Sequence, residues 1–189
     1  MQRVVGGRLK GRRLLPLPGK LQGVRPSSSR VRGAIYDRLQ REVRDARLLD
    51  LCAGTGALGI EGLSRGAREA VLVERHPGVA RFLEKQLEVL NLGGQATVRV
   101  SDAGKYLERE AVIPFDLILF DPPYDDRELY ARVLECVVGR GWLAEGGTLI
   151  VEYQPLSFPG GAPVWPGQLA LDAERAHGGT VLAFLSAAP

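Results

Sequence analysis

The sequence predicts an α/β protein built on one mostly parallel sheet. Short apolar runs alternate with segments whose apolar residues recur at helical spacing, a pattern typical of successive βαβ units. Two further apolar runs flank Gly178-Gly179 near the carboxyl terminus and predict a closing antiparallel hairpin. Together these observations predict about seven strands, with the hairpin forming an antiparallel edge.

Apolar periodicity sets the expected order of elements. Strands are predicted at 47–51, 70–73, 97–100, 115–120, 147–153, 169–173 and 180–185. Helices are predicted from the serines at 27–29 to Leu39, from the glycine loop at 54–59 to about Gly66, at 77–90 and at 128–139. A chain of 189 residues fits one compact domain.

The first part of the chain differs in pattern from the rest. Short alternating pieces at 3–5 and 13–15 are separated by Gly6-Gly7 and Gly11, and prolines follow them. We therefore expect residues 1–25 to form a basic arm or small hairpin outside the core. Residues 26–189 would form the main α/β domain.

Charge is distributed unevenly along the chain. Residues 1–47 contain thirteen Lys and Arg against three acidic residues, whereas the remainder contains twelve against nineteen. A first quarter carrying +10 beside a remainder carrying −7 favours contact with a polyanion, and nucleic acid is the natural candidate. The candidate phosphate contacts are Arg3, Arg8, Lys10, Arg12, Arg13, Arg25, Arg30 and Arg32.

A glycine loop follows the first predicted strand and predicts a nucleotide-type site. Ala53-Gly54-Thr55-Gly56 would let a ligand approach the backbone closely, and Glu74 lies twenty residues beyond Gly54, at the end of the next strand. That acid suits the ribose of either a nicotinamide dinucleotide or S-adenosylmethionine. Asp50, just before the loop, would repel a pyrophosphate and attract a cationic methionyl group, which favours the second cofactor.

Acidic residues also follow the third and fourth strands. Asp102, after the third, would accept a hydrogen bond from an adenine amine, with the Ala103 amide beside it. Asp121-Pro122-Pro123-Tyr124 directly follows the fourth. Because carboxyl ends of parallel strands share one edge of the sheet, Asp50, Glu74, Asp102 and Asp121 are expected to meet there.

The tetrapeptide suits an exocyclic amine of a nucleobase. The Asp121 carboxylate and the Pro122 carbonyl would accept the amine hydrogens and stabilise charge that develops on the nitrogen during methyl transfer. Pro122 and Pro123 restrict the backbone and hold these acceptors in place. Tyr124 offers a flat face for the base, a contact worth about 1 to 3 kcal/mol.

These motifs resemble those of RsmD-type ribosomal RNA guanine-N2 methyltransferases, within the class I S-adenosylmethionine-dependent methyltransferases. The resemblance extends over nearly the whole chain. It rests on Gly6-Gly7, Arg25-Pro26, the run from Asp50 through Glu61, Ser64-Arg65-Gly66-Ala67, and Asp121-Pro122-Pro123-Tyr124. It implies a Rossmann-like fold with a seven-stranded sheet, S-adenosylmethionine as cofactor, and one guanine of 16S ribosomal RNA as target, in an assembled or assembling 30S particle.

Several alternatives stay open. The tetrapeptide also suits an adenine-N6 or cytosine-N4 methyltransferase acting on DNA or RNA. From other classes, a dinucleotide-dependent oxidoreductase would lack an evident acid–base partner, and a noncatalytic RNA-binding module would not need Asp121. We expect neither Cys52 nor Cys136 to lie near Asp121, which argues against a cysteine nucleophile.

The remaining expectations concern the environment of the protein. The two cysteines have no metal-ligand spacing, so no metal site is predicted. No apolar run approaches the roughly 18 residues of a membrane span. We therefore expect a cytoplasmic monomer with no membrane contact.

Overall fold

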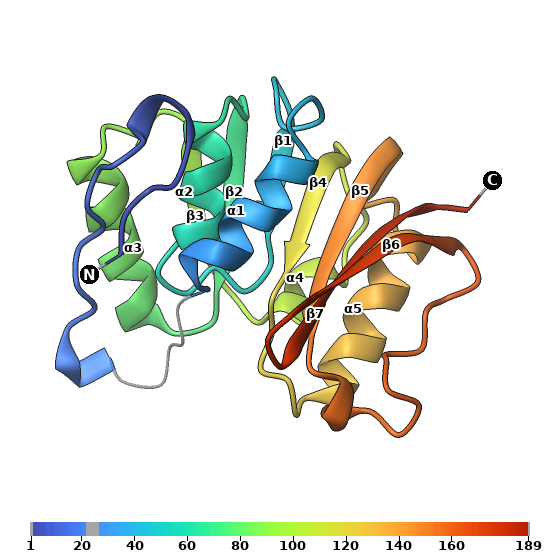
Figure 1. Cartoon of the computed structure of the whole chain (residues 1–189). Coiled ribbons are helices and arrows are strands. Elements are labelled where there is room, and N and C mark those ends of the chain that lie inside the picture. Colours follow the sequence, from blue (N-terminus) through green and yellow to red (C-terminus); the bar gives the residue numbers. More distant parts are fainter. Residues whose placement is uncertain (1, 22–26, 189) are drawn as a thin grey trace.

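The fold is taken from a computed structural model that describes residues 2–21 and 27–188 (Figure 1). Seven strands form one sheet in the order β3-β2-β1-β4-β5-β7-β6. Strands β1 to β5 are parallel, and β7 is antiparallel to both β5 and β6. The predicted parallel sheet with its antiparallel hairpin is confirmed. The strands are β1 (Arg47–Asp50), β2 (Glu69–Glu74), β3 (Ala96–Val100), β4 (Phe115–Phe120), β5 (Leu143–Tyr153), β6 (Leu169–His177) and β7 (Thr180–Ala187).

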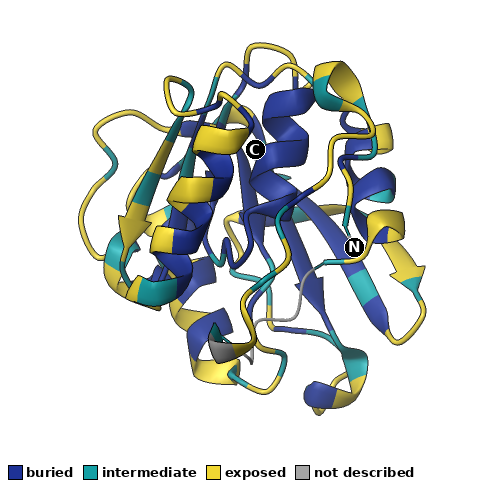
Figure 2. Cartoon of the chain, turned by 90° about the vertical axis from the view of Figure 1, so that its left-hand side faces the viewer, coloured by how far each residue is buried: buried dark blue, intermediate teal, exposed yellow. Residues whose placement is uncertain are grey.

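Helices cover both faces of the sheet, and each face packs against its helices in a separate apolar cluster. One cluster joins the sheet to α1 (Ser29–Arg38), α2 (Ala57–Ser64) and α3 (Pro77–Val89). The other joins it to α4 (Ala103–Leu107) and α5 (Arg127–Gly139). Successive residues of a strand point to opposite faces, so Leu117 and Leu119 belong to the first cluster and Ile118 and Phe120 to the second. The central strands are buried between these layers (Figure 2).

The largest differences from the sequence prediction are an earlier start of β5, a later end of β6 and an additional helix. Strand β5 begins at Leu143, and its pairing with β4 shifts in register between Phe115 and Leu117. Because such an irregularity interrupts the regular alternation of side chains along a strand, the sequence pattern did not indicate the first residues of β5. Helix α4 was not predicted, because five residues are too few to show a helical period.

The amino-terminal segment does not project as an arm outside the core. Arg3 and Arg13 form a single antiparallel bridge, and the turn between them contains a 3-10 helix at Gly7–Leu9. Val4 and Leu14 are each only 3% exposed and belong to the cluster that holds α1 and α2. The expectation that this segment stays out of the core is therefore wrong. We call residues 2–14 the N-terminal strap.

A buried carboxylate attaches the strap to α2. The amides of Val5 and Gly6 donate to the two oxygens of Glu61, at 2.8 and 2.7 Å. Glu61 is fully buried and also accepts from Arg65 Nε at 2.9 Å. Gly7 adopts φ +73°, and a Cβ there would lie 1.9 Å from the Ser64 carbonyl oxygen. Only glycine fits this close approach, which accounts for Gly7 in the sequence.

Candidate functional site

A cavity of about 930 Å³ opens at the carboxyl ends of the central strands. This edge includes the point where the chain reverses its strand order, between β1 and β4, which is where open α/β sheets bind ligands. The cavity is lined by ten of the predicted residues, namely Ala53, Gly54, Thr55, Glu74, Asp102, Ala103, Asp121, Pro122, Pro123 and Tyr124. The structure thus brings together the loops after β1, β2, β3 and β4.

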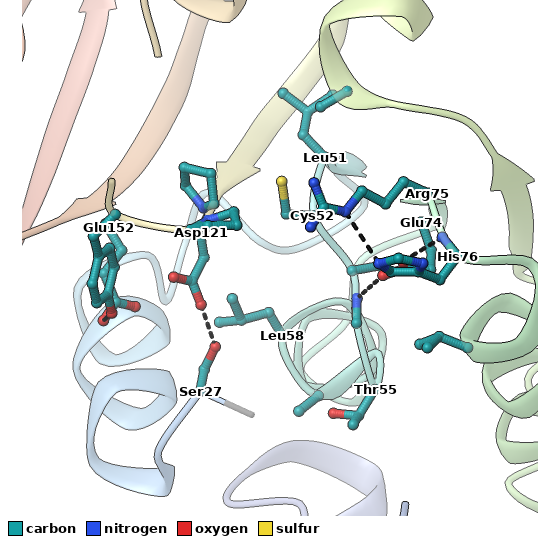
Figure 3. Close-up of a pocket in the computed structure, with 18 of the residues that line it drawn as sticks. Ser27, Leu51, Cys52, Thr55, Leu58, Glu74, Arg75, His76, Asp121 and Glu152 are labelled. Carbon is teal, nitrogen blue, oxygen red and sulfur yellow. Dashed lines mark hydrogen bonds between the residues drawn. The ribbon is translucent and has the colours of Figure 1, made fainter. Parts of the chain in front are cut away.

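The close-up view shows two ends of this cavity (Figure 3). Glu74, Arg75 and His76 lie at one end, whereas Asp121, Glu152 and Ser27 lie at the other. Across the described ranges, no three His, Cys, Asp or Glu side chains gather as a metal site would require. In the same part of the chain, no helix is long and apolar enough to cross a membrane.

Contacts with α3 hold the glycine loop in its conformation. Gly54 and Gly56 have φ of 53° and 77°, and a Cβ on Gly56 would lie 2.2 Å from Leu83 Cδ1 of α3. Gln86, buried on α3, donates its side-chain amide to the Thr55 carbonyl. Gly56 therefore serves the packing of the loop on α3, and it does not line the cavity.

Glu74 ties this loop to the end of β2. The Gly54 amide donates to Glu74 Oε2 at 2.9 Å, and the His76 amide donates to Oε1 at 2.8 Å. Each carboxylate oxygen has two lone pairs, so both retain acceptor capacity beside the cavity. His76 Nε2 accepts from Arg75 Nε at 3.3 Å. Glu74 thus braces the loop and keeps acceptor capacity at the cavity wall.

Asp102 has structural partners that the sequence did not indicate. Its Oδ1 accepts from the Lys105 amide at 3.0 Å, which caps α4, and from Arg132 Nη2 at 2.8 Å. Arg132 packs across Gly104, where a Cβ would come within 2.0 Å of its Nε. Asp102 therefore orients α4, and this orientation places Ala103 at the cavity wall.

Asp50 lies beneath the glycine loop and does not line the cavity. It is 1% exposed, and its Oδ2 accepts from the Gly59 amide at 3.2 Å. Burial, with a further contribution from the negative charge of Asp121, raises the pKa of Asp50 to about 7. Its influence on a ligand is consequently electrostatic, and it depends on pH near neutrality.

The Asp121 tetrapeptide is supported by two residues that the sequence did not identify. Ser27 Oγ, just before α1, donates to Asp121 Oδ2 at 2.6 Å (Figure 3). The Tyr124 hydroxyl donates to Glu152 Oε1 at 2.9 Å, and Glu152 is buried near the end of β5. Glu152, like the other acids, lies at the carboxyl end of a strand, so the same pattern could have identified it. Ser27 gave no such signal, because only the fold brings it to Asp121.

The expected position of Cys52 was wrong. It lies in the same cavity as Asp121, contrary to expectation. Burial, together with the nearby charges of Asp50 and Asp121, raises the pKa of the thiol well above its usual value. A thiol held neutral in this way is a poor nucleophile. The argument against a cysteine nucleophile therefore depends on the protonation of Cys52 and no longer on its distance from Asp121.

The described phosphate-contact candidates lie on two elements, the strap and α1. Arg8 contacts Gln95 at the amino end of β3, and Arg12 Nη2 reaches the Val89 carbonyl at 3.4 Å, so both lie away from the cavity edge. Arg30, on the first turn of α1, follows the cavity residues Ser27 and Ser28. Arg3, Lys10 and Arg13 are exposed on the strap, and Arg25 lies outside the described residues.

Arg32 is not available to a phosphate. It is 1% exposed and donates to the carbonyls of Ser27 and Arg3, and burial lowers the pKa of its guanidinium. Its position fixes Ser27 against the strap. The prediction that Arg32 contacts nucleic acid is therefore replaced by a structural role.

Comparison with known proteins gives consistent matches over nearly the whole chain. The family model described as Conserved hypothetical protein 95 matches residues 2–186. Ribosomal RNA small subunit methyltransferase D of Escherichia coli K12 is 35% identical over 176 residues, covering 93% of this chain and 85% of that protein. The protein of the same name from Haemophilus influenzae is 30% identical over 162 residues, covering 83% and 82%. The solved structure of yhhF from Escherichia coli superposes with a TM-score of 0.87 at 32% identity, covering 98% of this chain and 97% of that one.

Proposed function

The chain belongs to the RsmD family of methyltransferases, the family whose model is described as Conserved hypothetical protein 95, and we propose that it methylates the N2 amine of a guanine in small-subunit ribosomal RNA with S-adenosylmethionine. One observation carries the proposal: Asp121-Pro122-Pro123-Tyr124 ends β4 in the same cavity as the glycine loop and Glu74. An acceptor pair for an amine and a site for a nucleoside cofactor thus share one space.

The cavity fits the cofactor by the chemistry of its walls. Glu74 retains lone pairs for ribose hydroxyls, and the backbone of Gly54 and Thr55 allows close approach. Asp102 or the neighbouring Ala103 amide, which both line the cavity, would contact the adenine. Asp50, beneath the loop, favours a cationic methionyl group. When bound, S-adenosylmethionine supplies a methyl group activated by its sulfonium charge.

At the other end of the cavity, residues of the chain position the nucleobase. Asp121 Oδ2, oriented by Ser27, and the Pro122 carbonyl accept the two amine hydrogens. The hydroxyl of Tyr124 is anchored by Glu152, so the ring is fixed before the base lies on it. These contacts favour a nitrogen that carries developing positive charge, and catalysis is then mainly orientation and electrostatic stabilisation.

The proposed setting is the cytoplasm, with a monomer acting on an assembled or assembling 30S particle. Small subunits that lack the modification would be incubated with the protein and labelled S-adenosylmethionine, and the labelled nucleotide would be located by mass spectrometry. Naked 16S ribosomal RNA and DNA serve as parallel substrates. We expect a single N2-methylguanine. Label found only on adenine, cytosine or DNA would instead support the alternative exocyclic-amine reactions.

Replacing Glu74 by alanine tests the cofactor end of the cavity. Because two ribose hydroxyls would lose a charged acceptor and the Gly54 amide would lose its partner, we expect the Kd for S-adenosylmethionine to rise roughly tenfold to a hundredfold. Turnover at saturating cofactor should change little. Calorimetric titration measures the Kd, and Glu74→Gln, which keeps one acceptor, should lie between the two. An unchanged Kd in Glu74→Ala would place the ribose elsewhere.

Cofactor affinity should also depend on pH through Asp50. A cationic ligand stabilises the charged carboxylate and lowers its pKa, so binding releases a proton, and affinity rises with pH until Asp50 of the free protein is ionised. With a pKa of about 7, we expect about a tenfold gain in affinity between pH 6 and 8. Calorimetry in buffers of different ionisation enthalpy measures the proton released, and Asp50→Asn should flatten the profile. A flat profile in the unmodified protein would show that Asp50 does not sense the ligand charge.

The same shift predicts how stability of the ligand-free protein varies with pH. The carboxyl is usually ionised above 3.8, but in the folded chain only above about 7. Between these values the folded state binds the extra proton, so the contribution of Asp50 to stability falls as pH rises through this window.

A further inference from the structure

A second hollow, of about 440 Å³, lies next to the cavity on the face of the sheet that carries α1. It is lined by Ala34 and Arg38 of α1, Arg175 and His177 of β6, and Leu182 and Phe184 of β7. His177 lines both this hollow and the cavity that contains Asp121. The two spaces therefore adjoin at His177, and we call the second one the α1–β6 groove.

The charge of the groove follows from the pairing of β6 with β7. Arg175 pairs with Leu182 and His177 with Thr180, so these side chains share the sheet face that packs on α1. Glu174, which directly precedes Arg175, points to the opposite face, where it accepts from the Tyr153 hydroxyl at 2.7 Å. The residues that line the groove accordingly include two arginines and a histidine but no carboxylate. The nearby Asp37 of α1 is paired with Arg65.

The two arginines are placed to meet a ligand. Arg38 lies over the ring of Phe184 with its guanidinium carbon 4.9 Å from the ring centroid, and Phe184 beneath it is buried. This cation–π contact holds the guanidinium at the ring of Phe184, and Arg38 remains exposed at the surface. Arg175 is also exposed and donates to the Glu174 carbonyl at 2.9 Å. A fixed guanidinium plane beside a second cation matches a phosphodiester with its neighbouring base.

We propose that the α1–β6 groove binds the RNA nucleotide adjacent to the target guanine. Arg38 and Arg175 contact its phosphate, and His177 lies at the point where the strand passes from the groove into the catalytic cavity. This inference rests on the proposed function and extends it, because it gives the RNA a path that begins at the target base. It also locates the phosphate contacts next to the site, whereas Arg8 and Arg12 of the strap lie away from it.

The test removes the two groove charges with Arg38→Gln and Arg175→Gln together. The matched control removes two charges with Arg44→Gln and Arg140→Gln, exposed residues in the turn after α1 and at the end of α5. Loss of two charged hydrogen bonds should raise the KM for undermethylated 30S subunits at least about tenfold in the groove pair. The slope of log affinity against log salt should flatten by about 0.7, the value expected for the one single-stranded phosphate that both arginines contact.

Two further readouts separate RNA contact from damage to the fold. In the groove pair, kcat at saturating subunits and the Kd for S-adenosylmethionine should stay within about twofold of the unmodified protein, because neither arginine lines the catalytic cavity. The melting temperature should match that of the control pair within a few degrees, although Arg38 also lies in the last turn of α1. Arg38→Lys with Arg175→Lys should keep most of the salt slope, since it keeps the charge.

The failure of this inference differs from the failure of the proposed function. If the unmodified protein methylates the subunits but the groove pair has the same KM and salt slope as the control pair, the groove is not on the RNA path. If the unmodified protein does not methylate them, the proposed function fails. The groove is then judged by direct binding to the same subunits, where equal Kd values for the two pairs would overturn it.

Discussion

Replacing Asp121 by alanine is expected to lower turnover by about a hundredfold or more while leaving the Kd for S-adenosylmethionine within about twofold. The carboxylate is placed at the nucleobase end of the cavity by β4, by the two prolines that follow and by the hydrogen bond from Ser27. It would contact the amine as charge develops there, and Glu74 and the glycine loop would still hold the cofactor. Single-turnover assays with saturating cofactor measure the first quantity, and calorimetry measures the second.

Two companion variants show whether the loss comes from the carboxylate itself. Asp121→Asn keeps one acceptor oxygen without the charge, so its turnover should fall between the alanine variant and the unmodified protein. Ser27→Ala removes only the hydroxyl that orients Oδ2, and we expect a loss of less than about tenfold. Near-normal turnover in Asp121→Ala would show that the tetrapeptide is an ordinary turn after β4 and that the amine is held by other groups.

An independent readout comes from Asp50. The charge of Asp121 contributes to the raised pKa of Asp50, so Asp121→Ala should shift the pH dependence of cofactor binding towards lower pH. This shift, together with an unchanged Kd at alkaline pH, would show that the variant keeps an intact cofactor site and has lost the Asp121 charge.

The convergence of the acids on one edge was predictable because it needs only strand order and direction. Glu74, Asp102 and Asp121 each follow a strand of a parallel sheet, and strand ends of this kind share an edge. The same reasoning applied to the fifth strand identifies Glu152. Asp50 is the exception: like Glu74 it is the last residue of its strand, but its carboxylate lies under the glycine loop, where it accepts from the Gly59 amide, and it does not line the cavity.

The roles of Arg32 and the strap were not predictable from local patterns. A surface helix has one apolar face, but α1 is covered by the sheet on one side and by the strap on another. Arg32 and Tyr36 are therefore both buried. The sequence alone would place Arg32 on the polar, exposed face of the helix. Likewise Ser27 and Asp121 meet across 94 residues of sequence, a contact that no spacing rule contains.

Charge counts did not show which basic side chains are exposed, for a related reason. They correctly mark the first quarter of the chain as basic, but they do not say which guanidinium groups reach solvent. One of the predicted contacts, Arg32, donates to backbone carbonyls inside the fold, and the exposed ones lie on the strap and on the first turn of α1. Arg175, far along the sequence, completes the basic groove beside the cavity only because β6 returns next to α1.

The strap makes a strong prediction about stability: Glu61→Ala should lower the free energy of unfolding by about 3 to 5 kcal/mol. The Glu61 carboxylate accepts from the amides of Val5 and Gly6 and from Arg65, and Arg32 Nε lies 3.9 Å away. Removing it leaves two amides without their acceptor and an arginine that is 1% exposed without its counter-charge. Urea denaturation followed by circular dichroism gives the free energy, from the midpoint and the slope.

Matched substitutions separate this effect from a general loss of helix or charge. Glu84→Ala, on the exposed side of α3, removes the same atoms from solvent and should change stability by less than about 0.5 kcal/mol. Glu61→Gln keeps one acceptor oxygen and should fall between the two. Truncating the strap would not test RNA binding alone, because it would also leave Glu61 without its amide donors and uncover the apolar neighbours of Val4 and Leu14. If Glu61→Ala unfolded at the same urea concentration as Glu84→Ala, the strap would be a loosely attached segment, and its contribution to the core would have to be withdrawn.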